Sequence, residues 1–369
     1  MNVISIIIVY FISSWTLSTL LHKSDSILQK RKVHNAHKLI FLTLPPLILG
    51  FYFIAMRPFD AGGDTVNYLS AFARIGAPIS ATADSAYGTE MLFWPTQALM
   101  KPFLDQRGWL VANYLIVIFL TLIAYKKFTE KTPITPYIFS FVLLTFFAVY
   151  AGNAMRQIYS IPLGLIAFNY CYRKNYLYFL IFAALSIAFH WSAVIILASP
   201  LFTRLPNKRS YYVGIPLVAI ACSSLIGPLI EIATNLTGLS WLTDKSNLYL
   251  NGGRVSQVES VWKTVNFWLC VSIYIALILT KAIIDEQHEN LAKFLLMFFS
   301  LMLFAVANVD VSERYMVWFL FLVPLAVAVI FSKIKMPAAL NNQLFLTLFL
   351  LMAVLVFTRE SAIATLGIS

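Results

Sequence analysis

Long apolar stretches alternate with short polar connections along almost the whole chain. Stretches close to the roughly 20 residues that an α-helix needs to cross a bilayer recur from Val3 to Phe357. The first, Val3–Leu21, has no basic residue before it and no small-residue cleavage pattern after it, so we expect a retained helix and not a signal peptide. The pattern predicts an all-α polytopic membrane protein in which residues 1–369 form a single transmembrane domain.

Composition supports a lipid environment and excludes several functions. Of the 369 residues, 60% are hydrophobic and 12% are charged, which is more apolar surface than a soluble domain of this size can bury. The net charge of +11 is spread over the loops, so nucleic acid is not expected as a partner. The three cysteines lie singly in apolar stretches, and no Gly-rich phosphate loop, dinucleotide fingerprint or metal-binding histidine pair occurs. We therefore expect no metal, no cofactor, and a substrate that is already activated in the membrane.

The basic residues orient the predicted helices. Five of them lie between Lys23 and Lys38, which marks this segment as cytoplasmic. Alternation from this point gives ten crossings with short basic connections on the inner side. The expected crossings are Val3–Leu21, Leu39–Met56, Leu110–Tyr125, Tyr137–Tyr150, Ile158–Tyr170, Tyr211–Ala233, Val265–Thr280, Leu291–Val306, Tyr315–Phe331 and Leu344–Phe357.

Two apolar segments do not fit as simple crossings. If Gly88–Leu104 crossed the membrane, the Lys126–Lys127 connection would lie outside, so we predict a helix in the outer interface. Leu177–Phe202 holds about 26 apolar residues between two basic loops and predicts a helical hairpin with His190 near its tip. The total is about 10–12 transmembrane helices, with an outer loop plus interfacial segment over residues 57–107 and a large outer loop over residues 235–262.

Arginine and lysine are distributed differently across this topology. The inner side carries thirteen Lys and four Arg, whereas the outer side carries three Lys and seven Arg. The positive-inside bias should deplete both residue types outside. Arg offers a planar fork that binds phosphate or carboxylate bidentately and stays charged when partly desolvated. The outer arginines therefore predict an anionic ligand, and the alternative is that they pair with outer acids or lipid headgroups.

The first outer segment, from Arg57 to Tyr68, combines a cation, two carboxylates and a Gly-Gly pair directly after the second predicted helix. A loop of this composition can wrap a polar headgroup. The alternative is a helix end followed by a glycine turn, with Asp64 as the N-cap of the next helix and Tyr68 on its apolar face.

Further polar positions interrupt apolar stretches. Arg156, followed by Gln157, lies about one turn into a predicted helix, where a charge should face either a diphosphate or an acid in the bundle interior. His190 is a candidate general base, proton shuttle or phosphate donor, although a lone His more often satisfies a backbone group. Glu313 and Arg314 lie at the start of a spanning helix, where the helix dipole explains the acid but not the arginine.

These segments, in this order, resemble the Wzy-type O-antigen and exopolysaccharide polymerases, in particular the EpsG-like branch. The resemblance extends over about Ala55–Tyr315, and in one departure, Tyr87-Gly-Thr-Glu90, no Pro follows the acid. It implies ten to fourteen spanning helices, an outward-facing cavity, and no metal or nucleotide cofactor. The positions that carry it are Arg57, Gly63-Asp64-Thr65, Tyr68, Glu90, Met155-Arg156-Gln157, Phe189-His190 with Ser192, and Ser312-Glu313-Arg314-Tyr315.

The same resemblance implies a polysaccharide polymerase, a metal-independent glycosyltransferase of the bacterial inner membrane. It implies that polyprenyl-diphosphate-linked oligosaccharide repeat units are joined on the outer, periplasmic face, and that membrane lipid and a chain-length regulator are further partners. The candidate diphosphate ligands are Arg57, Arg156, Arg314 and, more weakly, Arg254, and the candidates for other substrate contacts are Gln157, Tyr68 and Glu313.

Glycosyl transfer also needs a base for the acceptor hydroxyl, within about 3 Å of it. Asp64, Glu90 and His190 compete for this role, and we prefer His190, with Asp64 orienting the sugar or pairing with an arginine. Two other functions would use the same lipid. An O-antigen ligase is disfavoured by an outer loop of only 28 residues, Asn235–Trp262. A flippase predicts midplane charges on several helices, whereas the candidate charges here cluster at the predicted outer interface.

Overall fold

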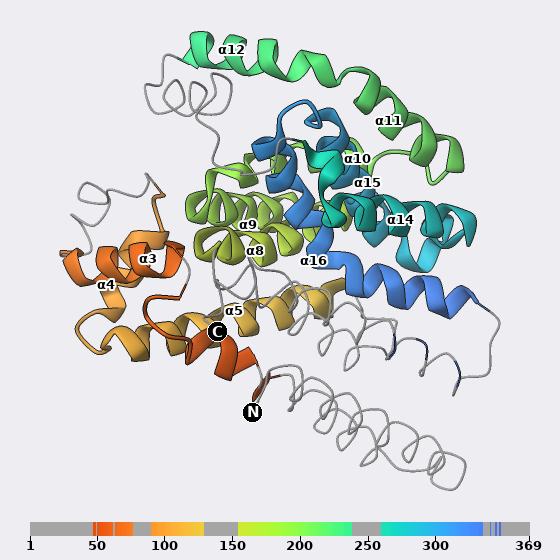
Figure 1. Ribbon diagram of the computed structural model, residues 1–369. Helices are drawn as coiled ribbons and strands as arrows, with labels where there is room; N and C mark the ends of the chain where they lie inside the picture. Colours follow the sequence, from red (N-terminus) through yellow and green to blue (C-terminus); the bar gives the residue numbers. More distant parts are fainter. Residues whose placement is uncertain are drawn as a thin grey trace, which may run out of the picture. The chain divides into compact units, whose positions relative to one another are not determined.

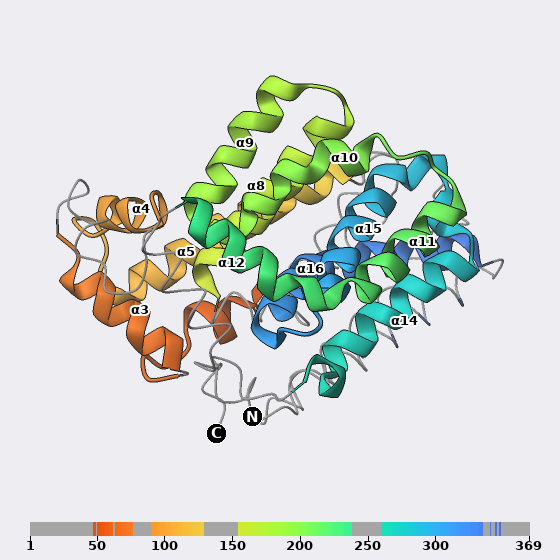
Figure 2. The ribbon, with the colours of Figure 1, turned by 90° about the horizontal axis from the view of Figure 1, so that it is seen from above.

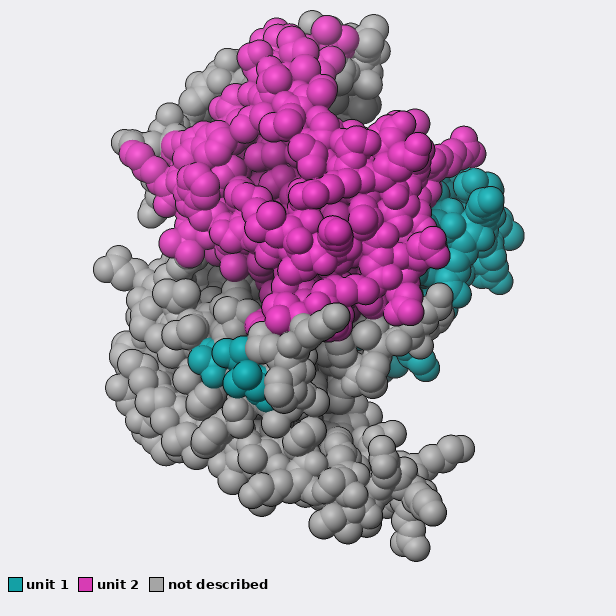
Figure 3. Space-filling view, turned by 90° about the vertical axis from the view of Figure 1, so that its right-hand side faces the viewer, with its two compact units in different colours: residues 1–196, 335–369 teal, residues 197–334 magenta. Residues whose placement is uncertain are grey.

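The computed structural model describes residues 47–48, 50–61, 63–76, 90–128, 154–237 and 260–334, together with residues 340, 344 and 347. This part of the chain is helical and contains no β-strand, as the hydropathy pattern predicted (Figure 1). The chain falls into two compact units, residues 1–196 with 335–369 and residues 197–334, which Figure 3 colours separately.

Two helices of the described ranges are long and apolar enough to cross a membrane. They are α5 (Gln106–Phe128) and α16 (Val309–Lys333), with mean hydropathies of 2.0 and 2.3. A bent pair of shorter helices qualifies as a third span if it is counted as one. The helix count stays a prediction, because several segments lie outside the described residues: Val3–Leu21, Tyr137–Tyr150, most of Leu39–Met56 and Leu344–Phe357, and most of the outer loop 235–262.

The first half of unit 1 packs short helices against α5. These are a π-helical turn, η1 (Phe51–Ala55), then α3 (Gly63–Arg74) and α4 (Phe93–Met100). Phe72 of α3 stacks on Trp109 of α5 with ring centroids 5.0 Å apart. Tyr68 of α3 meets Phe93 of α4 edge to face at 5.8 Å. The segment predicted as an interfacial helix is therefore helical as α4, and aromatic contacts hold α3 against both neighbours.

The second half of unit 1 is an antiparallel helix pair, α8 (Met155–Tyr172) and α9 (Tyr176–Phe189), which lie side by side in both ribbon views (Figures 1 and 2). Their connection is a Schellman motif, in which Lys174 has a left-handed φ of 60°. The N–H groups of Lys174 and Asn175 donate to the carbonyls of Cys171 and Tyr170, both at 2.9 Å. Because this turn is tight, the start of α8 and the end of α9 lie at the same end of the pair.

The stretch predicted as a hairpin, Leu177–Phe202, is divided into two helical segments at His190. α9 ends at Phe189, and His190 has an extended backbone with φ −160° and ψ 126°. Its N–H still donates to the carbonyl of Ser186 at 3.1 Å, and a 3-10 helix (Trp191–Ala198) begins at the next residue. An imidazole in an otherwise apolar stretch thus coincides with the point where the backbone leaves helical geometry.

Unit 2 is built around stacked aromatic rings. Its helices are α10 (Ser199–Thr203), α11 (Arg209–Ala221), α12 (Ile226–Thr237), α14 (Val265–Leu279), α15 (Glu289–Phe304) and α16. Phe298 of α15 stacks on Trp318 of α16 with centroids 4.7 Å apart, and Tyr274 of α14 stacks on Phe299 at 4.0 Å. These contacts bury the apolar faces of three helices against one another.

The stretch predicted as one crossing, Tyr211–Ala233, is bent by 52° after α11. Ser223–Leu225 form a 3-10 turn at the bend. Pro228, one turn further on, has no N–H to extend an α-helical ladder back across this turn. The crossing predicted over Tyr211–Ala233 is therefore bent, which hydropathy does not register because it carries no information on a local loss of hydrogen bonding.

Candidate functional site

The carboxylate of Glu90 connects the cation of α8 to the imidazole that follows α9. Nη1 of Arg156 donates to both carboxylate oxygens of Glu90 at 2.8 Å. Nδ1 of His190 lies 3.3 Å from Oε1 of the same carboxylate. The Glu90 side chain is fully buried, whereas 22% of the Arg156 side chain remains exposed. Three residues that are far apart in the sequence therefore form one charged cluster.

Backbone contacts explain why Glu90 reaches the end of α9. Leu92, two residues after Glu90, donates its N–H to the carbonyl of Ala188 at 3.0 Å. Ala188 in turn precedes His190 by two residues. This single hydrogen bond places the entry to α4 beside the exit from α9, so the carboxylate and the imidazole meet.

α3 contributes two further side chains to the cluster. Nε of Arg156 donates to the hydroxyl of Tyr68 at 3.1 Å. Asp64 lies one helical turn before Tyr68, is exposed, and feels the charge of Arg156. Asp64, Tyr68, Glu90, Arg156 and His190, all singled out in the sequence, therefore come together, and we call these five residues the Glu90 cluster.

The charges in the Glu90 cluster shift the pKa values of its two carboxyl groups in opposite directions. Burial alone would raise the pKa of Glu90, but the hydrogen bond with His190 and the charge of Arg156 outweigh it and lower this pKa to about 2. Burial raises the pKa of Asp64 above its ordinary value, and Arg156 opposes that shift. Glu90 is thus a stable anion and a weak proton acceptor at neutral pH, whereas Asp64 is the stronger base of the two.

Arg57 occupies a different environment in the same unit. It is 2% exposed. Its guanidinium donates to the hydroxyl of Thr65 at 3.0 Å and to the carbonyl of Ile54. Burial and the nearby charge of Arg107 lower the pKa of Arg57 to about 10. These contacts tie the end of η1 to the first turn of α3.

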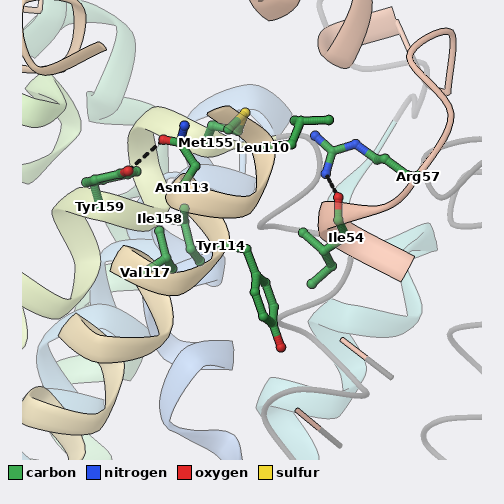
Figure 4. A pocket seen from close by; sticks show the side chains of 9 residues that line it. All are labelled: Ile54, Arg57, Leu110, Asn113, Tyr114, Val117, Met155, Ile158 and Tyr159. Carbon is green, nitrogen blue, oxygen red and sulfur yellow. Dashed lines mark hydrogen bonds between the residues drawn. The ribbon is translucent and has the colours of Figure 1, made fainter. Parts of the chain in front are cut away.

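Arg57 also lines a small pocket between η1, α5 and α8. Figure 4 shows its guanidinium opposite Asn113 and Tyr159, whose side chains are joined by a 2.6 Å hydrogen bond. The cavity volume is about 10 Å³, which is close to the space that one water molecule needs. This space is far smaller than a diphosphate, and the role of Arg57 as a diphosphate ligand stays a prediction.

Sequence reasoning missed two basic residues that satisfy backbone carbonyls. Nη1 of Arg107 donates to the carbonyls of Ala55 and Arg57 at 2.9 and 2.8 Å. Nζ of Lys101 donates to the carbonyls of Ala73 and Ile75 at 2.8 and 2.6 Å. Cations on the predicted outer side thus hold η1 and the C-terminus of α3, which gives part of the arginine enrichment a structural cause. No local sequence signal reports such contacts, because the partners lie 26 to 52 positions away.

Three further predicted site residues, Gln157, Glu313 and Arg314, lie in the described part of the chain. Gln157 is buried, 7% exposed, beside Arg156 on α8. Glu313 and Arg314 lie in the first turns of α16 in unit 2, where Asn308 caps the helix by accepting from the N–H of Val311 at 3.1 Å. Arg254 lies outside the described residues. Within the described ranges, no three His, Cys, Asp or Glu side chains are grouped as metal ligands.

Comparison with known proteins assigns the chain to a family. A model of the EpsG family matches residues 39–366, a range that contains every position on which the sequence resemblance rests. Searches of curated proteins and of solved structures give no significant match. Because the family match extends over most of its length, the chain belongs to the EpsG family.

Proposed function

We propose that this protein is a polysaccharide polymerase that joins polyprenyl-diphosphate-linked oligosaccharide repeat units on the outer face of the bacterial inner membrane. Membership of the EpsG family supports a polymerase-like function. The observation that carries the proposal further is the Glu90 cluster, in which one buried carboxylate contacts both a histidine and a partly exposed arginine. Glycosyl transfer from a diphosphate requires a base and a cation, and here both contact the same carboxylate.

In the proposed reaction, the acceptor hydroxyl oxygen forms a bond to the anomeric carbon of the donor sugar. The bond from that carbon to the diphosphate oxygen breaks, and the hydroxyl proton passes to a base. Negative charge develops on the departing diphosphate, so a fixed cation beside it lowers the barrier. The products are the extended glycan and a free polyprenyl diphosphate, and the reaction draws no energy from a nucleotide.

His190 is the proposed base. Its Nδ1 faces the carboxylate of Glu90 at 3.3 Å, and Glu90 is an anion at neutral pH. A carboxylate in this position accepts the Nδ1–H and selects the tautomer whose Nε2 takes up a proton. Glu90 then orients the imidazole and stabilises the imidazolium that forms, which suits a carboxyl too acidic to be the base itself. Asp64, exposed and less acidic, is the alternative base or a sugar ligand.

Arg156 is the proposed principal diphosphate ligand. Glu90 and Tyr68 hold the guanidinium through two of its nitrogens, so its direction is set before substrate arrives. The exposed 22% of the side chain gives an anionic group access to it. Arg314 and Arg254 are proposed as further diphosphate ligands, and Gln157, Tyr68 and Glu313 as further substrate contacts. Arg57 is proposed to support the site through α3, since its buried guanidinium donates to the hydroxyl of Thr65 and the carbonyl of Ile54.

The test is an incubation of purified protein with polyprenyl-diphosphate-linked repeat units, without added nucleotide or metal, with products resolved on a gel. We expect a ladder in steps of one repeat unit that is lost in Arg156→Ala. Arg209→Ala is the matched control, because Arg209 is an exposed arginine at the start of α11. A folded protein that yields single transfers to a lipid core would identify a ligase, and transbilayer movement of the donor without polymer would identify a flippase.

A further inference from the structure

Two buried serines join α8 to α9 by a reciprocal pair of hydrogen bonds. The hydroxyl of Ser160 donates to the carbonyl of Ser186 at 2.8 Å, and the hydroxyl of Ser186 donates to the carbonyl of Ser160 at 2.8 Å. The two hydroxyl oxygens approach each other to 3.0 Å. Both residues are 0% exposed. Each hydroxyl proton thus bonds across the helix interface, at one matched level of the two helices.

The serines lie one helical turn from the two groups that contact Glu90. Ser160 follows Arg156 by four residues, and Ser186 precedes His190 by four residues, in helices that run in opposite directions. The carbonyl of Ser186 accepts both the hydroxyl of Ser160 and the backbone N–H of His190, the latter at 3.1 Å. The hydrogen bond from Ser160 therefore has the same acceptor, the carbonyl oxygen of Ser186, as the backbone N–H of His190.

We propose that Ser160 and Ser186 are positioning residues, a clamp that fixes the axial register of α8 against α9 and so brings Arg156 and His190 to the same carboxylate. A slip of one residue moves a helix by about 1.5 Å along its axis. Added to the 2.8 Å between Arg156 and Glu90, a slip of this size exceeds hydrogen-bonding distance. Arg156 and His190 could then not both keep their contacts with Glu90. Apolar packing between two membrane helices tolerates sliding, whereas paired hydroxyl–carbonyl bonds select one register. The proposal rests on the proposed role of the Glu90 cluster in glycosyl transfer.

The clamp predicts a loss of turnover that is larger than any loss of donor binding. In Ser160→Ala/Ser186→Ala we expect kcat to fall roughly 10- to 100-fold, since a displacement of about 1 Å at a reacting group has an effect of this size. KM for the lipid-linked donor should change less than threefold. Ser300→Ala is the matched control, because Ser300 is a buried serine of α15 whose hydroxyl has no hydrogen-bond partner. Equal protein yield and melting temperature in both variants exclude general misfolding as the cause.

A covalent replacement of the clamp separates register from packing. In Ser160→Cys/Ser186→Cys, with the three native cysteines changed to alanine, oxidation should join the helices at the same level, because the native oxygens are only 3.0 Å apart. We expect the oxidised protein to regain most of the wild-type kcat and the reduced protein to lose it again. If the oxidised protein stays as slow as the alanine pair, the register explanation is overturned.

Parallel assays of Glu90→Gln and His190→Asn distinguish failure of the clamp from failure of the proposed function. If these two variants are inactive and the alanine pair turns over within twofold of wild type, the clamp is wrong and the site assignment stands. If Glu90→Gln and His190→Asn themselves polymerise at the wild-type rate, the Glu90 cluster is not the site and the clamp has nothing to position. Loss in all three, with rescue by the disulfide, supports both.

Discussion

Arg57 and Arg156 are two arginines of unit 1 whose guanidinium groups meet different acceptors. Arg57 is 2% exposed and donates to a hydroxyl and a carbonyl, and its pKa falls to about 10. Arg156 keeps 22% of its side chain exposed and donates to the carboxylate of Glu90 and the hydroxyl of Tyr68. Exposure and the nature of the partner therefore separate an arginine that organises the backbone from one that a substrate anion can approach.

The two arginines also act on different parts of the chain. Arg57 contacts Thr65 in the first turn of α3, the helix that carries Asp64 and Tyr68. Arg156 contacts Tyr68 directly, so both cations contact α3. Substitution of Arg57 should thus affect the fold first and the rate second, whereas substitution of Arg156 should affect the rate first.

The largest effect is expected at the histidine that shares Glu90 with Arg156. Replacement of His190 by Asn keeps a polar side chain of similar size but removes the group proposed to accept the acceptor proton. General base catalysis contributes about 10²- to 10⁴-fold, and we expect a loss of polymerisation rate in this range. The rate of ladder formation at saturating donor measures it. Unchanged polymer length and amount in cells that carry the variant would remove His190 from the mechanism.

Arg156→Lys should lower the polymerisation rate on the order of 100-fold, equivalent to about 3 kcal/mol of transition-state stabilisation. Lysine keeps the positive charge, but a single ammonium group cannot reproduce the planar fork that bonds Tyr68 and Glu90 together. The same exchange at Arg57 is the internal control and should change the rate less than tenfold. An equal loss of rate in both variants would contradict the separation of the two arginines.

We expect the contribution of Glu90 to the stability of the fold to be lost in acid. Its folded-state pKa of about 2 is below the ordinary 4.5, so its stabilising effect is complete above about pH 4.5 and is lost as the pH falls towards 2. The contribution amounts to a few kcal/mol. Melting temperatures of wild type and Glu90→Gln should therefore differ most at neutral pH and converge towards pH 2. A constant difference in melting temperature across this range would show that the contacts with Arg156 and His190 do not lower the pKa of Glu90.

The smallest of these effects is expected at Arg57. Arg57→Met removes hydrogen bonds from a charged donor and should lower the free energy of unfolding by about 2 kcal/mol. The rate per folded molecule should stay within about tenfold of wild type, because α3 is also held by Phe72 against Trp109. Chemical denaturation of the purified protein measures the first quantity and the ladder assay the second. A large loss of rate with unchanged stability would make Arg57 a substrate ligand.

Local sequence pattern was enough to find the helical class, the break at His190 and the family. Apolar runs imply helices because every backbone polar group must be satisfied within lipid. The basic loops on both sides of Leu177–Phe202 predicted a break in this stretch, and α9 ends just before His190. The order of the polar segments around Arg57, Arg156 and His190 pointed to the EpsG family, and the family match confirms that reading. These properties depend on residues that are close in the sequence.

Only the tertiary structure identified Glu90 as the shared partner of Arg156 and His190, which are 66 and 100 positions away from it. It also showed that Arg107 and Lys101 donate to backbone carbonyls and that Ser160 faces Ser186. Contacts of this kind depend on how helices pack, and hydropathy along one chain does not indicate which polar groups face each other across a helix interface. The sequence by itself thus determined the helical class and the candidate chemistry, whereas packing decided which candidate residues meet.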